Sequence, residues 1–380
     1  MIYHLFQLLE DYDIPGQGLM TYLSFRAMLA SVTAMLLSLF VGRKIIHWLQ
    51  KKQIGETIRD LGLEGQMQKK GTPTMGGVII LLAISVSTLL FCDLSNIYTQ
   101  LLIFTTLWCG GIGFTDDYIK VFKHNKEGMS ERWKLILQIV LGFIVGLTVC
   151  FNDDIVVREK VRVETADNGT TYLPQGSSNL DVNSETIVAD NSWKMENIVK
   201  STKTTLPFIK SHEFDYKWLS PFQGKWGWYT KWAIYVLMIV IVITACSNGT
   251  NLTDGMDGLA AGTSAIVGIV IGILAWLSGN LINSNYLNIM YIPGTGEIAV
   301  FMSAFIGALL GFLWYNSYPA QVFMGDTGSL AIGGIIGVSA ILIRKELLLP
   351  ILCGIFFVES FSVLILRICF KYTKIKIATG

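Results

Sequence analysis

The sequence carries little charge for its length. Of its 380 residues, 15% are charged and 52% are hydrophobic, and the formal net charge is only +1. Charged residues make up about a quarter of a typical soluble domain, so this composition indicates a protein whose main solvent is lipid. The near-zero net charge also argues against nucleic-acid binding, which requires an extended basic surface.

Cysteine and histidine patterns typical of zinc sites are missing as well. The chain has six cysteines without CxxC spacing, and only four histidines. All six cysteines lie within or beside apolar stretches, so we interpret them as packing residues. The polar chemistry must therefore come from carboxylates, lysines and amides.

What the sequence does contain is a series of apolar stretches close to the length that crosses a bilayer as a helix. They are residues 19–41, 75–92, 97–114, 135–150, 232–246, 259–277, 298–315, 330–343 and 347–370. Backbone groups in lipid must be satisfied internally, and short alternating strands are missing from these stretches. The sequence therefore predicts an all-α, polytopic membrane helix bundle with about nine transmembrane helices. The first stretch lacks a basic leader and a small-residue cleavage site, so we expect a retained helix.

Basic residues in the short connections collect on one side of the predicted bundle. They are Arg43, Lys44, Lys51, Lys52, Arg59, Lys69, Lys70, Lys120, Lys123, Lys126, Arg132, Lys134, Arg367, Lys371, Lys374 and Lys376. The opposite short connections contain only Arg344 and Lys345. Because such residues mark the cytoplasmic side, we expect a multi-pass protein of a bacterial inner membrane with its amino terminus outside.

A polar gap divides the apolar stretches into two groups. We expect residues 1–150 to hold helices one to four, 151–231 to form an external insertion, and 232–380 to hold helices five to nine. Within the insertion, residues 156–173 alternate around Asn168-Gly169, which favours a β-hairpin, although an insertion without fixed structure fits equally well. Trp218, Trp226, Trp228, Tyr229 and Trp232 then lead into the fifth helix, as aromatic residues do at a membrane interface.

The acidic clusters all fall on the predicted cytoplasmic side. They are Asp116 and Asp117 after the third stretch, Asn251, Asp254 and Asp257 after the fifth, and Asp326 after the seventh. Lys69 and Lys70 precede the second stretch on the same side. Carboxylates near lipid are costly, and Mg²⁺ prefers carboxylate and phosphate oxygens, so this side is the candidate for a diphosphate site. Glycines at 76, 77, 255, 258, 325 and 328 permit close backbone approach to phosphate, and helix-start amides beside them can face an anion.

Each cluster also has an ordinary structural explanation. Asp116-Asp117 at a helix end is more often a cap, the glycines can serve helix packing alone, and Phe323 would ordinarily be an interface anchor. Independent caps, however, should occur on both sides of the bundle. The gathering of all these clusters on one side therefore favours a site.

Four of these segments, in this order, resemble the polyprenyl-phosphate N-acetylhexosamine-1-phosphate transferase family. They are KKGTPTMGG (69–77), FTDDYIK (114–120), NLTDGMDGLAAG (251–262) and FMGDTGSLA (323–331). The resemblance covers nearly the whole chain outside the insertion, and four ordered motifs make it specific. The sequences of the first and third motifs are most similar to those of family members that use UDP-N-acetylmuramoyl-pentapeptide.

The resemblance implies that undecaprenyl phosphate attacks the sugar-bound phosphorus of this donor, releasing UMP and leaving a lipid diphosphate. Asp326 resembles the family's Mg²⁺ ligand, and Asp116 and Asp117 resemble the pair near the lipid phosphate, one of them acting as base or nucleophile. Residues matching the nucleoside side and the phosphates are Lys70, Thr74, Lys120, Lys134, Asn251, Asp254, Asp257 and Phe323. The implied partners are the UDP-linked donor, the lipid acceptor and membrane lipid, with a homodimer left open.

Two features depart from the family pattern. A histidine-rich motif and a further helix are expected after residue 380, whereas the histidines here are His4, His47, His124 and His212. We therefore expect a chain extended through those elements to turn over faster than residues 1–380. The long external insertion is also atypical, but it lies on the side away from the motifs.

Three other functions remain to be weighed. Members that transfer N-acetylglucosamine phosphate share the Asp-Asp pair and are the nearest alternative. A secondary carrier would place ionisable groups near the midplane between internal repeats, and neither feature occurs here. A non-catalytic scaffold would not need acids gathered on one side.

Overall fold

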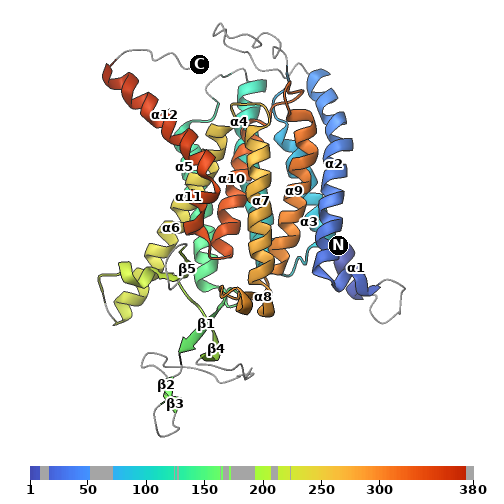
Figure 1. Cartoon of the computed structure of the whole chain (residues 1–380). Helices are drawn as coiled ribbons and strands as arrows, with labels where there is room; N and C mark the ends of the chain where they lie inside the picture. The colour runs from blue at the N-terminus through green and yellow to red at the C-terminus, as the bar shows by residue number, and fades with distance from the viewer. Residues whose placement is uncertain are drawn as a thin grey trace.

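The computed structural model of the chain describes residues 1–8, 17–51, 72–123, 125, 128–162, 164–165, 171–172, 193–206, 213–222 and 224–373. Its main helices are α1 (Ile2–Leu8), α2 (Leu23–Lys51), α3 (Gly77–Phe91), α4 (Ile97–Phe122), α5 (Glu131–Phe151), α6 (Gly224–Thr253), α7 (Leu259–Ser278), α8 (Leu281–Tyr286), α9 (Gly296–Asn316), α10 (Gly325–Leu342), α11 (Leu349–Leu352) and α12 (Gly354–Thr373). Short 3-10 helices are η2 (Gln17–Thr21), η4 (Tyr216–Leu219) and η5 (Glu346–Leu348). Figure 1 shows the long helices standing side by side as a bundle.

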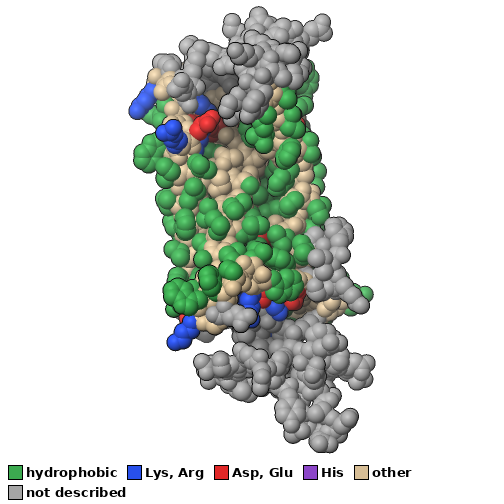
Figure 2. Space-filling view, turned by 90° about the vertical axis from the view of Figure 1, so that its left-hand side faces the viewer, with side chains coloured by type: hydrophobic (Ala, Val, Ile, Leu, Met, Phe, Trp, Pro, Cys, Tyr) green, Lys and Arg blue, Asp and Glu red, His purple; other side chains and the backbone are tan. Residues whose placement is uncertain are grey.

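Among the described residues, seven helices are long and apolar enough to cross a membrane. The bent pair 346–352 and 354–366 brings the number to eight when its two halves are counted as one span, and α3, at the remaining predicted stretch, is shorter than these helices. The described residues therefore hold seven or eight candidate spans, where the sequence predicted about nine. Hydrophobic side chains cover the side of the bundle, and charged side chains collect towards its two ends (Figure 2). The prediction of a polytopic helical membrane protein is confirmed.

Several helix ends differ from those of the predicted stretches, and one predicted stretch is bent. The first spanning helix begins at Leu23, after η2, and continues to Lys51. The third continues past Phe114 to Phe122, and the fifth begins at Gly224 rather than Trp232. The ninth stretch, expected as one helix, bends by 74° between α11 and α12. The apolar stretch shows where a helix crosses the membrane. The helix continues beyond that stretch where its polar side chains form hydrogen bonds or ion pairs with neighbouring elements.

The described strands lie at one end of the bundle and form three two-stranded antiparallel sheets. They are β1 (Val157–Arg162), β2 (Glu164–Thr165), β3 (Thr171–Tyr172), β4 (Trp193–Val199), β5 (Lys203–Thr205) and β6 (Glu213–Asp215). Strands β2 and β3 pair across positions 168–169, as the hairpin signal predicts. Strand β1 instead pairs with the distant β4.

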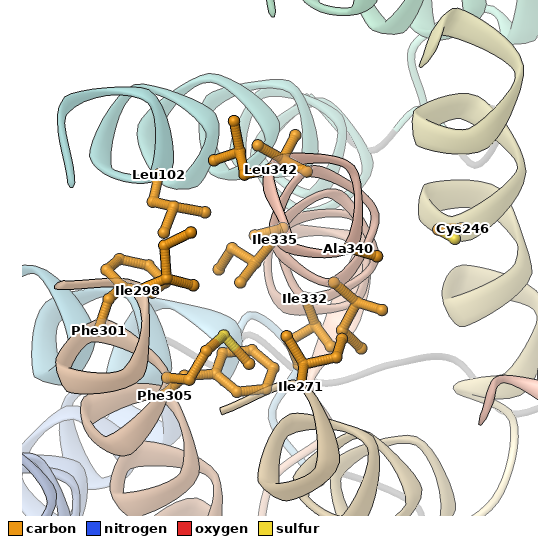
Figure 3. Packing of buried hydrophobic residues seen from close by; sticks show 14 of the residues in the cluster. Leu102, Cys246, Ile271, Ile298, Phe301, Phe305, Ile332, Ile335, Ala340 and Leu342 are labelled. Carbon is orange, nitrogen blue, oxygen red and sulfur yellow. The ribbon is translucent and has the colours of Figure 1, made fainter. Parts of the chain in front are cut away.

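Helix α10 lies at the centre of the bundle, with contacts to α3, α4, α6 and α7. Figure 3 shows Ile332 and Ile335 of α10 among side chains of its neighbours, including Leu102, Phe305 and Ile271. Nearly every side chain of α10 is buried, so the helix has no lipid-facing stripe. A helix that is apolar all round is typical of a core position.

Small residues four apart set several of the helix contacts. Gly307 and Gly311 of α9 face the backbone of α2, and Gly142 and Gly146 of α5 face valines of α6. Gly333 of α10 meets the backbone of α6 at Cys246. A methyl group on these glycines would overlap the neighbouring helix, and such spacing is how membrane helices approach closely.

Residues of the insertion pack against the connection that follows the C-terminal end of α10. Thr205 donates its N–H to the carbonyl of Arg344 at 3.0 Å, and Tyr216 donates to Glu346 Oε1 at 3.2 Å. Arg344 and Lys345, the two basic residues on the sparsely charged side, are both buried beneath these contacts. The described residues 201–206 and 213–219 are therefore packed on the bundle, which excludes an unstructured loop for this part of the insertion.

Candidate active site

The three aspartates of the second and fourth motifs meet at the end of the bundle opposite the strands. Asp116 and Asp117 lie in the last turns of α4, and Asp326 is the second residue of α10. One carboxylate oxygen from each lies within 4.8 Å of the other two. Asp116 and Asp117 are 0% and 5% exposed, so the interpretation of this pair as a solvated cap is wrong.

Two lysines bridge Asp116 and Asp326. Lys134 Nζ, from the first turn of α5, lies 2.9 Å from Asp116 Oδ1 and 2.6 Å from Asp326 Oδ2. Lys120 Nζ, one turn after Asp116, lies 2.6 Å from Asp116 Oδ2 and 3.2 Å from Asp326 Oδ2. We call these five residues the acid–lysine centre. Its three carboxylates face two ammonium groups, which leaves one uncompensated negative charge.

Asp117 has a different set of partners from Asp116. Its carboxylate accepts hydrogen bonds from the N–H of Asp326 at 3.2 Å, the N–H of Thr327 at 2.9 Å and the hydroxyl of Thr327 at 2.5 Å. Asp117 therefore caps the first turn of α10 from another helix, where a negative charge complements the helix dipole. The sequence suggested that these amides can face an anion, and the anion that they face is the carboxylate of Asp117.

Glycine makes this approach of α4 to α10 possible. A methyl group on Gly113 would overlap the backbone carbonyl of Asp326, and one on Gly77 would overlap the backbone of Gly328. Gly325 has φ +73°, and a side chain there would reach 2.7 Å from Asp117 Oδ2. For these glycines the helix-packing explanation is the correct one, because their neighbours are protein backbone and carboxylate.

The loop between α4 and α5 also contributes to the centre. The N–H of Met129 donates to Asp116 Oδ1 at 2.7 Å, after Gly128 turns the chain with φ +65°. A side chain on Gly128 would approach the same carboxylate oxygen at 2.5 Å. Sequence reasoning missed Met129, because a backbone donor leaves no residue-type signal.

The residues expected on the nucleoside side lie on the connections around this end. Asn251 accepts a hydrogen bond from Ser329 of α10 at 2.8 Å, and Asp257 accepts one from the N–H of Ala320 at 3.2 Å. Phe323 is half-buried, and its backbone pairs with Pro73 and Gly76, so that half-buried Thr74 lies beside it. Asp254 is half-buried in the turn after α6, and Lys70 lies outside the described residues.

Two further positions emerge from the structure. Thr327 supports Asp117, and it could have been suspected because it directly follows Asp326 in the fourth motif. Gln138, buried in α5 one turn from Lys134, exchanges hydrogen bonds with Asn248 of α6 at 2.8 and 3.3 Å. A polar amide within an apolar stretch was its available signal.

An apolar groove lies in the membrane-spanning part of the bundle. It has a volume of about 520 Å³ and runs between α5, α6 and the first turns of α12. Leu135, Val240, Leu252 and Phe356 are among its lining residues. Leu135 directly follows Lys134 in the chain, although none of the five residues of the acid–lysine centre lines the groove itself.

A buried centre of three carboxylates and two lysines at the end of a bundle of membrane-spanning helices is typical of the active site of a membrane enzyme. The chain matches Glycosyl transferase family 4 over residues 190–344 and the phospho-N-acetylmuramoyl-pentapeptide-transferase signature 1 over residues 69–81. It is 52% identical over 380 residues to a phospho-N-acetylmuramoyl-pentapeptide-transferase of Parabacteroides distasonis, covering 100% of this chain and 86% of that protein. Identity to enzymes of the same name is 51% for Flavobacterium psychrophilum, covering 100% and 89%, and 50% for Porphyromonas gingivalis strain W83, covering 100% and 86%. The chain belongs to the phospho-N-acetylmuramoyl-pentapeptide-transferase family, a family of transferases in peptidoglycan synthesis.

Proposed function

We propose that this protein transfers phospho-N-acetylmuramoyl-pentapeptide from its UDP-linked precursor to undecaprenyl phosphate, with Mg²⁺ as cofactor. The products are UMP and the lipid-linked intermediate, lipid I. The observation that carries the proposal is the convergence of Asp116, Asp117 and Asp326 with Lys120 and Lys134. Full-length similarity to enzymes named for this donor favours it over N-acetylglucosamine phosphate.

The donor set of the centre fits Mg²⁺. Carboxylate oxygens are hard ligands of the kind that Mg²⁺ prefers, and the ion usually takes one or two of them together with phosphate oxygens. Asp326 is the candidate ligand, because both oxygens of Asp117 are engaged by α10 and both oxygens of Asp116 are engaged by Lys120, Lys134 and the N–H of Met129. The bound ion would neutralise charge on the transferring phosphate.

The two aspartates of the second motif would then divide their roles. Asp117 holds the first turn of α10, and thereby Asp326, in place. Asp116 is held by lysines and one backbone amide, which are groups that an entering phosphate can also engage. We therefore assign Asp116 to the lipid phosphate, as base or as nucleophile.

Lys120 and Lys134 would position the reacting phosphates. A phosphate oxygen of the lipid forms a bond to the sugar-bound phosphorus, and the bond from that phosphorus to the oxygen shared with UMP breaks. The ammonium group of Lys120 lies within 3.2 Å of the carboxylates of Asp116 and Asp326. A lysine in this position could bind the phosphates of the donor and of the lipid. Catalysis of phosphoryl transfer depends mainly on such positioning and charge neutralisation.

The apolar groove is the candidate site for the prenyl chain of the acceptor. It would hold a hydrocarbon chain whose phosphate ends beside Lys134. Its location in the membrane-spanning part would let the acceptor enter from lipid. The positive-inside pattern supports a cytoplasmic location of the centre, where the nucleotide-linked donor is available, in the inner membrane of a bacterium.

The test is UMP release from UDP-N-acetylmuramoyl-pentapeptide by the purified protein in nanodiscs with undecaprenyl phosphate and Mg²⁺. Asp326→Asn should lower turnover by about two orders of magnitude or more, because it removes a charged ligand and charge stabilisation. Asp116→Asn and Asp117→Asn should lower the rate more than they weaken donor binding. Asp93→Asn, at the opposite end of the bundle, is the matched control. Near-normal turnover of Asp326→Asn across a Mg²⁺ titration would contradict the metal assignment, and preference for UDP-N-acetylglucosamine would contradict the donor.

A further inference from the structure

Residues 216–232, which connect the insertion to α6, form an unusually aromatic segment. It contains Tyr216, Trp218, Phe222, Trp226, Trp228, Tyr229 and Trp232. Most of these rings are exposed: the exposed fraction is 68% for Trp218, 74% for Trp226 and 62% for Tyr229. We call residues 216–232 the aromatic segment. The proposed function leaves it without a role.

The aromatic segment is also basic. It carries Lys217, Lys225 and Lys231 and no aspartate or glutamate. Lys217 and Lys225 are exposed, and Lys231 Nζ lies 5.8 Å from the ring centre of Trp232. Its charge is therefore +3 on a chain whose net charge is +1, and the charge lies among apolar rings.

The place of the segment in the fold indicates which surface it meets. It lies at the end of α6 that is opposite to the acid–lysine centre, and from Trp232 onward α6 is apolar. Figure 1 shows η4 and the start of α6 at the side of the bundle near the strands, not beneath its middle. Tyr216 and Trp232 are buried, and Tyr216 donates a hydrogen bond to Glu346, so both ends of the segment are fixed on the bundle. The five rings between them are exposed.

We propose that the aromatic segment binds anionic phospholipid headgroups at the membrane surface farthest from the acid–lysine centre. Tryptophan and tyrosine rings occupy the headgroup level of a bilayer, and lysines among them attract anionic lipid. The segment is continuous with a membrane-spanning helix, so a bilayer surface is already beside it. The inference depends on the chain crossing the membrane and does not depend on the reaction it catalyses.

The experiment measures lipid selectivity in reconstituted membranes with spin-labelled phosphatidylglycerol and phosphatidylcholine. At low salt the wild type should favour the anionic lipid by about twofold to fivefold over a variant with Lys217→Gln, Lys225→Gln and Lys231→Gln. The matched control replaces the same three lysines by arginine and should retain the preference. Lys200→Gln, which removes a lysine paired with Asp153 elsewhere in the insertion, should leave the preference unchanged.

Far-ultraviolet circular dichroism and thermal unfolding establish that each variant is folded, without reference to activity. Loss of the preference in the glutamine variant alone supports the proposal. An equal preference in wild type and glutamine variant would assign selectivity to other basic residues and overturn it. No preference in the wild type would overturn it as well, and would leave a protein partner as the occupant of the exposed rings.

Discussion

Asp116 and Asp117 are neighbours in the chain, yet they differ in what holds them. Successive helical residues point about 100° apart, so one carboxylate meets the lysines and the other meets the first turn of α10. The sequence predicted the pair but not this division, because it depends on which groups α5 and α10 present. The effects of Thr327 and Lys345 also depend on their local partners, and substitutions of these two residues test them.

Thr327 supports Asp117 through its hydroxyl group. Thr327→Val removes that hydroxyl and keeps the shape, so Asp117 loses its shortest hydrogen bond. A hydrogen bond to a charged group is worth about 1.5–3 kcal/mol, so turnover should fall about tenfold or more. Steady-state kinetics should show the loss in kcat, and Thr327→Ser should restore most of it. Equal rates for the valine and serine variants would contradict the role of the hydroxyl.

Lys345 lies in the connection after α10, beneath the insertion. Burial lowers its pKa from 10.5 to about 8, against the opposing influence of Glu346 and Glu213. The unfolded chain therefore binds more protons between pH 8 and 10.5, so Lys345 destabilises the fold below pH 8, and this cost is relieved as pH rises. The relief approaches about 3 kcal/mol over that interval.

The measurement is thermal unfolding in detergent at a series of pH values. The wild type should gain stability between pH 8 and 10 relative to Lys345→Met, which cannot titrate. At pH 7 the methionine variant should be the more stable protein. Parallel curves for the two proteins would contradict the lowered pKa.

At the scale of the element, apolarity predicted where each helix crosses the membrane but not where it ends. Helix α4 continues through Asp116, Asp117 and Lys120, because each of these side chains finds a partner on α5 or α10. Apolarity also did not predict the bend between α11 and α12, because the sequence is apolar on both sides of it. Tertiary partners, which one sequence does not show, decided these boundaries.

The contact between α4 and α10 gives a prediction about helix spacing. Gly113→Ala should push the two helices apart, because the added methyl group would overlap the carbonyl of Asp326. Turnover should fall at least tenfold, an effect of about 1.4 kcal/mol or more, although no charged group of the centre is altered. Gly111→Ala is the matched control on the same helix, since nothing lies within 4 Å of its added methyl group. Similar activity of the two variants would show that α4 tolerates the extra volume.

At the scale of the whole molecule, the sequence predicted the class of fold and the gathering of the acidic motifs at one end of the bundle. That was possible because lipid imposes few solutions on a chain, and because polar groups near lipid are conspicuous. It could not predict that Arg344 and Lys345 are buried, since the covering residues are more than a hundred positions away. The pairing of β1 with β4 was also not predictable, because the paired residues, such as Val157 and Val199, are far apart in the chain.

The orientation of the bundle follows from the same charge pattern and can be tested in cells. A cysteine at Ser178 should react with an impermeant maleimide, and one at Lys126 should react only after the membrane is permeabilised. Both positions lie outside the described residues, so the prediction comes from the sequence alone. Five native cysteines are buried, which keeps background labelling low. The opposite pattern would place the acid–lysine centre outside the cell.

The central position of α10 also bears on the order in which the bundle is assembled. Its neighbours α3, α4, α6 and α7 all precede it in the chain, so they enter the bilayer before it. A nascent chain therefore holds Asp116 and Asp117 while the space for α10 is still vacant and Asp326 has not been translated. Because the third carboxylate arrives on the helix that fills this space, the five residues of the acid–lysine centre come together only when α10 inserts, before α11 and α12 follow. A partly inserted chain therefore lacks a complete acid–lysine centre.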